Sequence, residues 1–79
     1  MNLVSDSAKR DYGHLVALIG RRVKLQYTSD VYTELLPGDE GVVDHIDDFG
    51  TMFVKWDVGS SLGLNAEFGD RWVVLPENK

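Results

Sequence analysis

The sequence has no cysteine among its 79 residues, and it has no long apolar run. A chain without cysteine cannot form a disulfide framework, a thiolate metal site or a thiol nucleophile, and such a composition fits a reducing compartment. No stretch approaches the roughly 18 apolar residues that span a bilayer, and polar residues stand where the apolar core of a signal peptide would begin. We therefore expect a small cytoplasmic protein that does not engage membranes.

Recognisable catalytic and metal-binding motifs are also lacking. His14 and His45 have no candidate nucleophile in a recognisable motif nearby, and Ser60 and Ser61 lack the G-x-S-x-G context of a hydrolase. The run D-H-I-D-D at residues 44–48 contains carboxylates that suit a hard cation, but it is far short of the spaced oxygen ligands of a calcium loop. We expect no enzymatic activity, no catalytic residues, no metal ligands and no cofactor.

The sequence does contain a clear β-hairpin over residues 37–57, and the rest of the chain is organised around it. Met52, Val54 and Trp56 alternate with other residues after the turn D-D-F-G at 47–50, as in a half-buried strand. Trp72 is likewise in phase with a neighbouring valine, so we expect both tryptophans to lie in the core. A shift of one residue near Asp44 would reverse which side chains of the first hairpin strand face inward.

The remaining segments predict one helix and three further strands. Tyr12, Leu15, Val16 and Ile19 fall at i, i+3, i+4 and i+7, which predicts a helix over about 6–19, and Gly20 stands at its C-terminal end. Strands are expected over 21–27, 61–64 and 71–75, with a long apolar connection at 28–36 that folds back over the sheet and a one-turn break near 65–70. In the first of these strands Val23, Leu25 and Tyr27 are expected to face inward. The chain is therefore expected to be a single domain over 1–79, mainly β: a small five-stranded SH3-like barrel over about 21–75 with one N-terminal α-helix.

Four segments between residues 20 and 75 carry a family resemblance: G-R-R-V-K-L, D-x-Y-T-x-L-x-P-G-D-x-G-V-V, I-D-D-x-G-T-x-x-V-K-W-D-x-G-S-x-L-G-L and D-R-W-x-V-L. They resemble an uncharacterised family of small SH3-like barrel domains found in phages, plasmids, bacteria and archaea. The resemblance implies the barrel but no agreed activity. Its phage setting would suit an inhibitor of host defence, such as an anti-CRISPR protein acting in the host cytosol.

Charge is distributed unevenly along the chain. Residues 30–70 contain ten acidic residues against one lysine, whereas residues 1–29 contain five basic residues against two acidic ones. So acidic a segment repels phosphate, and direct contact between it and nucleic acid is not expected. The sharper hypothesis is that the acidic face mimics nucleic acid and blocks a basic nucleic-acid-binding surface of a host protein or complex. The expected contact residues are Asp39, Glu40, Asp44, Asp47, Asp48 and Asp57, with Phe49 and Phe53 as exposed apolar anchors.

Three alternatives stay open at this point. The acidic residues could serve only to keep a small domain soluble. The protein could be an adaptor that holds an extended peptide between the long connection and the central hairpin, in which case Tyr32 would matter. The basic N-terminal part, with Arg21, Arg22 and Lys24, could bind nucleic acid directly. The sequence does not predict the oligomeric state.

Overall fold

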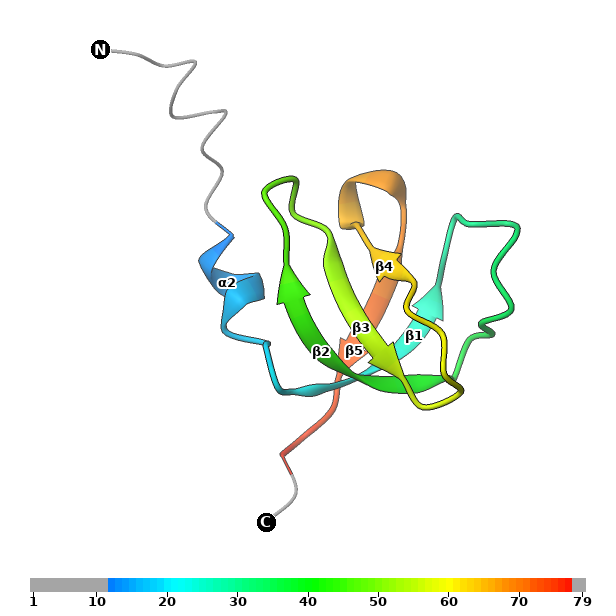
Figure 1. The fold of residues 1–79 in the computed structure, drawn as a ribbon, viewed down its shortest axis with the longest axis horizontal. Helices are drawn as coiled ribbons and strands as arrows, with labels where there is room; N and C mark the ends of the chain where they lie inside the picture. Colours follow the sequence, from blue (N-terminus) through cyan, green and yellow to red (C-terminus); the bar gives the residue numbers. More distant parts are fainter. Residues whose placement is uncertain (1–11, 78–79) are drawn as a thin grey trace.

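The computed structural model describes residues 12–77 and contains five antiparallel strands in the predicted order (Figure 1). The elements are the helix α2 (Gly13–Val16), β1 (Arg22–Tyr27), β2 (Glu40–Ile46), β3 (Met52–Trp56), β4 (Gly63–Leu64), the 3₁₀ turn η1 (Ala66–Phe68) and β5 (Arg71–Val74). The mainly β fold with five strands, a short N-terminal helix and a one-turn break before the last strand is confirmed.

The strands form one curled sheet in the order β4-β3-β2-β1-β5, so that β5 passes behind β3 in the view of Figure 1. The concave side holds the core, which consists of alternate residues of the strands together with one residue of the long connection. Trp56 is a buried member of this core, and Trp72 packs against it half-buried, as their phase in the sequence predicts. The buried core residues are Val23, Leu25, Leu35, Val43, Met52, Val54, Trp56 and Leu64.

Gly41 lets β2 and β3 approach closely at the base of the hairpin. A Cβ atom at this position would lie 2.5 Å from the carbonyl oxygen of Lys55 and 2.7 Å from the Cα of Trp56, both of them backbone atoms. Backbone atoms of a paired strand cannot move aside without breaking the ladder. Glycine at this position therefore helps to place Trp56 in the core.

Two irregularities change which side chains face the core. Val43 pairs with Val54 and His45 pairs with Phe53, so Asp44 is the extra residue of a bulge in β2. A second register shift, between Leu25 and Tyr27, lies where β1 pairs with β5. The prediction that Tyr27 faces inward is wrong, because this shift turns its ring outward and leaves it 57% exposed.

The N-terminal helix is shorter than predicted within the described residues. It spans only Gly13–Val16, and residues 6–11 of the expected helix lie outside the part of the chain that the structure describes. After Val16 the chain tightens into i→i+3 turns, so that Leu18 joins Leu15 in packing inward while Val16 and Ile19 are exposed. Gly20 does adopt the predicted left-handed conformation, with φ of +89°. No helix within residues 12–77 has the length and apolar character needed to cross a membrane.

Candidate functional site

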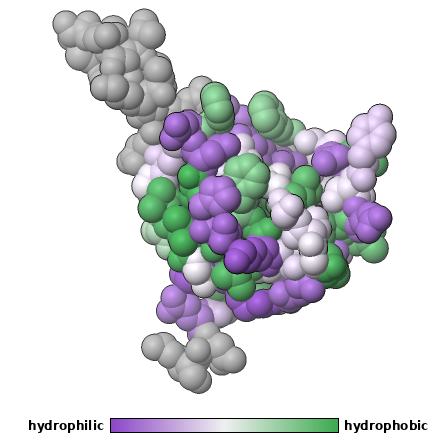
Figure 2. All heavy atoms as spheres, in the orientation of Figure 1, coloured by the Kyte–Doolittle hydropathy of each residue, from purple (hydrophilic) through white to green (hydrophobic). Residues whose placement is uncertain are grey.

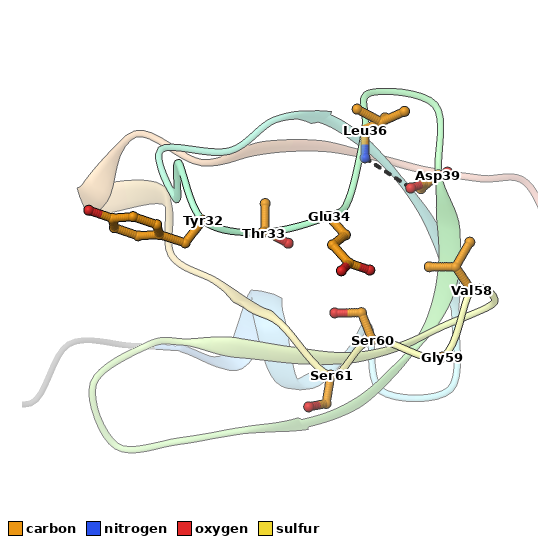
Figure 3. Close-up of a pocket in the computed structure, with 9 residues that line it drawn as sticks. All are labelled: Tyr32, Thr33, Glu34, Leu36, Asp39, Val58, Gly59, Ser60 and Ser61. Atoms are coloured by element: carbon orange, nitrogen blue, oxygen red, sulfur yellow. Dashed lines mark hydrogen bonds between the residues drawn. The ribbon is translucent and has the colours of Figure 1, made fainter.

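A concavity within residues 12–77 lies between two loops at one end of the sheet (Figure 3). One wall is the connection from β1 to β2, and the other is the turn from β3 to β4. The pocket has a volume of about 770 Å³. Its lining residues are Tyr32, Thr33, Glu34, Leu36, Asp39, Val58, Gly59, Ser60 and Ser61.

The first wall is held by one buried anchor and a series of local hydrogen bonds. Leu35 is 4% exposed and fixes the loop in the core, which confirms that this connection folds back onto the sheet. The N–H of Tyr32 donates to the carboxylate of Asp30 at 2.8 Å, and the N–H of Leu36 donates to Asp39 Oδ2 at 2.9 Å. Short Asp side chains commonly fix turns in this way. The loop therefore holds a defined shape although most of its apolar side chains point to solvent.

The second wall is attached to the core through Trp56. Its indole Nε1–H donates to the carbonyl of Leu62 at 2.9 Å, and its backbone N–H donates to the carbonyl of Ser60 at 3.2 Å. The N–H of Gly59 in turn donates to the carbonyl of Trp56 at 2.8 Å. The backbone and side chain of one buried residue thus fix the turn at several points, and the Val58 side chain is exposed at its rim.

The pocket presents apolar and acidic groups to solvent. Tyr32 lies at one end of the pocket and is 93% exposed, while Leu36 and Val58 are exposed near the other end. Glu34 points across the opening toward Ser60, and Asp39, which accepts the N–H of Leu36, is also part of the lining (Figure 3). The lining contains no lysine or arginine. An open groove with one aromatic group, two aliphatic groups and two carboxylates can hold an amphipathic ligand with positive charge.

The start of the first wall is fixed by a buried carboxylate that the sequence pattern did not single out. Asp70 is 5% exposed and accepts hydrogen bonds from Thr28 Oγ1 at 3.0 Å, from Ser29 N at 2.7 Å and from Asn65 N at 2.8 Å. Burial raises the pKa of Asp70, but the hydrogen bonds from Asn65, Ser29 and Thr28 outweigh burial and bring the pKa below its ordinary value. Asp70 therefore connects the start of the β1–β2 loop, at Thr28 and Ser29, to the backbone at Asn65.

The predicted acidic contact residues are spread along the whole central hairpin, and most have partners within the chain. Arg22 Nη2 contacts Asp57 at 2.5 Å and Glu40 at 3.4 Å, which offsets the charge of both carboxylates. Asp39 caps the long loop, as described above. Only these three lie near the pocket end of the hairpin, and of them only Asp39 lines the pocket.

The other three acidic residues lie in β2 or at the opposite turn. Asp44 Oδ2 is 2.7 Å from His45 Nδ1, and the hydrogen bond with His45, reinforced by nearby Lys55, lowers the pKa of Asp44. Asp47 Oδ1 accepts hydrogen bonds from two backbone N–H groups of its own turn, at residues 49 and 51. Asp48 is exposed, and no partner is described for it within residues 12–77. Figure 2 shows hydrophobic and hydrophilic side chains interspersed on the face that it displays.

The two predicted apolar anchors differ from each other. Phe49 is 78% exposed at the tip of the β2–β3 turn, as expected. Phe53 is only half-exposed, because its ring stacks on His45 with 4.7 Å between centroids. The structure does not bring either ring to the pocket, which uses Tyr32 instead.

A second, smaller pocket of about 320 Å³ lies between α2 and η1. It is mostly apolar, and its floor includes Leu15, Leu18 and Trp72. The ring of Tyr12 covers Gly50 there, since a Cβ atom at Gly50 would lie 2.6 Å from that ring. Among residues 12–77 no three His, Asp or Glu side chains converge in a way that could hold a metal ion.

Comparison with known proteins agrees with this fold. The family model described as Domain of unknown function (DUF4314) matches residues 12–69 of the chain. No curated protein matches the sequence significantly. The crystal structure of the Arabidopsis RDM15 tudor domain, solved in complex with an H3K4me1 peptide, superposes with a TM-score of 0.58 at 24% identity, over 76% of this chain and 95% of that one. The fold is therefore tudor-like, within the class of small SH3-like barrels that the order of strands predicts.

Proposed function

The chain belongs to the DUF4314 family, and from this starting point we propose that it is a non-enzymatic module that binds an extended peptide in the pocket between the β1–β2 loop and the β3–β4 turn. The observation that carries this proposal is the pocket itself. Two loops with buried anchors, Leu35 and Trp56, hold exposed Tyr32, Leu36 and Val58 around one open groove. Exposed apolar side chains on a rigid rim are typical of a binding site.

Two further considerations support a peptide as the ligand. The groove is open along its length, which suits an extended chain better than a small molecule that must be enclosed. The tudor domain with the similar fold was crystallised with a peptide. A small barrel of this shape is thus able to present a peptide-binding surface.

Replacing Tyr32 by Ala is expected to weaken peptide binding about tenfold without destabilising the fold. Tyr32 is 93% exposed, so its ring contributes little to the core, whereas an aromatic anchor at an interface often contributes more than 1 kcal/mol to binding. Binding is measured by fluorescence anisotropy with peptides selected from a random display library on the wild-type protein. Tyr27→Ala is the matched control, because that tyrosine is also exposed but does not line the pocket. Equal losses in the two variants, or no loss in Tyr32→Ala, would contradict the proposal.

Inhibition of a nucleic-acid-binding host complex has weaker support. Of the six proposed acidic contacts, all except Asp48 have a described partner within the chain, and they lie at both ends of the hairpin. Reversal of Asp47 to Lys would also disturb the turn that its carboxylate caps, so that substitution cannot separate binding from folding. Asp48→Lys is the clean test of an acidic contact face. If Asp48→Lys binds a nucleic-acid-binding host complex as tightly as the wild type does, inhibition through an acidic contact face is excluded.

Direct nucleic-acid binding by the basic part of the chain is also weakened as a candidate. Arg21 donates to the carbonyl of Leu75 at 2.9 Å and lies 3.4 Å from a carboxylate oxygen of Glu77. Arg22 is engaged by Glu40 and Asp57. Because both arginines already serve interactions within the chain, few positive charges remain available for phosphate at this surface.

A further inference from the structure

The structure points to a specific ligand class: we infer that the pocket selects an unmodified lysine or arginine side chain of the bound peptide, with Glu34 as the group that receives it. This inference rests on the proposed peptide-binding function and deepens it. It follows from the charge of the lining, the direction of Glu34 and the small number of aromatic groups.

Charge complementarity decides whether the pocket prefers a positively or a negatively charged ligand. Glu34 and Asp39 both line the pocket, and no lysine or arginine does. Arg22, which pairs with Glu40 and Asp57, does not line the pocket. An anionic peptide would therefore meet uncompensated repulsion, whereas a cationic one would be attracted and correctly oriented.

Glu34 is the better placed of the two carboxylates. It points into the opening toward Ser60 (Figure 3), it is exposed, and no partner is described for its carboxylate within residues 12–77. Asp39, in contrast, already accepts the N–H of Leu36 through Oδ2. A ligand ammonium or guanidinium can thus form charge-assisted hydrogen bonds with Glu34 without displacing any interaction of the folded protein.

The rim suits the hydrocarbon part of a long basic side chain. Leu36 and Val58 are 67% and 66% exposed at the pocket, and they can pack against methylene groups while the charged end reaches Glu34. Tyr32 offers one aromatic face to a cation or to a neighbouring residue of the peptide. A lysine or arginine satisfies both the apolar rim and the acidic centre of the pocket.

Methylation of the lysine is not expected to improve binding. Methylammonium groups are recognised by cages built from several aromatic faces, and Tyr32 is the one aromatic residue in this lining. Trimethylation keeps the charge but removes every N–H donor, so it removes the hydrogen bonds to Glu34. The chemistry of this pocket therefore favours the unmodified side chain.

The test uses five nine-residue peptides that share the sequence G-S-A-L-X-A-S-G-G and differ only at X. X is Lys, Arg, trimethyllysine, Gln or Glu, and each peptide is titrated into the ¹⁵N-labelled protein while amide chemical shifts are followed. The Lys and Arg peptides are expected to bind about two- to fivefold more tightly than the Gln peptide, the range of one favourable exposed ion pair. Shifts should concentrate at residues 32–36 and 58–61.

Glu34→Gln is expected to remove the preference for Lys and Arg over Gln, and higher salt should have the same effect in the wild type. Asp48→Asn is the matched control, because it removes an equal charge from an exposed residue that does not line the pocket. If Lys, Gln and Glu peptides bind equally at this pocket, or if trimethyllysine binds most tightly, the inference is wrong although the proposed function stands. If library-selected peptides fail to bind at the pocket at all, the proposed function itself fails.

Discussion

Replacing Trp56 by Ala is expected to lower the free energy of unfolding by about 4 kcal/mol, which is about a third or more of the total stability of a domain of this size. The Trp56 side chain is 3% exposed, and its indole donates to the carbonyl of Leu62. The substitution therefore removes a large buried apolar surface and leaves the carbonyl of Leu62 without this donor. Native domains of this length have a stability of only about 4–12 kcal/mol in total.

Urea denaturation followed by circular dichroism measures this effect directly. Trp72→Ala is the matched control, because Trp72 packs against the same core but is only half-buried, so we expect a smaller loss. Trp56→Phe keeps one buried aromatic ring but removes the indole donor to Leu62 and part of the buried volume, so its stability should lie between those of the wild type and Trp56→Ala. Should Trp72→Ala prove as costly as Trp56→Ala, the central role assigned to Trp56 would be wrong.

Asp70→Asn is expected to destabilise the fold by about 3 kcal/mol, the second largest effect. The Asp70 carboxylate is buried and accepts from the N–H groups of Ser29 and Asn65 and from the hydroxyl of Thr28. An amide has one oxygen instead of two and turns a donor toward donors, which leaves buried N–H groups without acceptors. The loss should appear in urea denaturation at neutral pH, where Asp48→Asn at an exposed position should change stability by less than about 0.5 kcal/mol.

The same carboxylate makes stability depend on pH in a defined direction. The pKa of Asp70 is lowered in the folded state, so the unfolded chain binds its proton more readily. The stability that Asp70 contributes is fully present above its unfolded pKa of about 4 and is lost as the pH falls through the folded pKa. Denaturation curves between pH 7 and pH 2 should therefore show a steeper acid loss in the wild type than in Asp70→Asn. Parallel pH profiles for the two proteins would contradict this assignment.

Alternation and turn residues were sufficient to predict the strands. Met52, Val54 and Trp56 alternate because β3 is regular, and all three are buried as predicted. The prediction was wrong for Tyr27, where a register shift that leaves no trace in the residue pattern turns the side chain outward. The periodic pattern also predicted a longer helix than residues 12–19 form. The helix ends at Val16, and the turns that follow bring Leu18 inward.

The candidate site was less predictable than the fold. Tyr32 was recognised as relevant to a peptide groove, but its partner wall at residues 58–61 is separated from it by the whole central hairpin. Only the curl of the sheet brings the two loops together. Asp70 was missed for a related reason, since its donors Thr28 and Ser29 are 42 and 41 residues away in the sequence. The one local signal was an Asp directly before a strand, which is also common in ordinary turns.

The anchors of the two pocket walls and the side chains at their rim are different residues. Leu35, Trp56 and Asp70 are buried and hold the loops, whereas Tyr32 and Glu34 are exposed and take no part in the core. Substitutions at the mouth of the groove thus carry little cost for folding. Ligand preference could diverge quickly among proteins that share this scaffold, so that two of them with the same barrel need not recognise the same sequence.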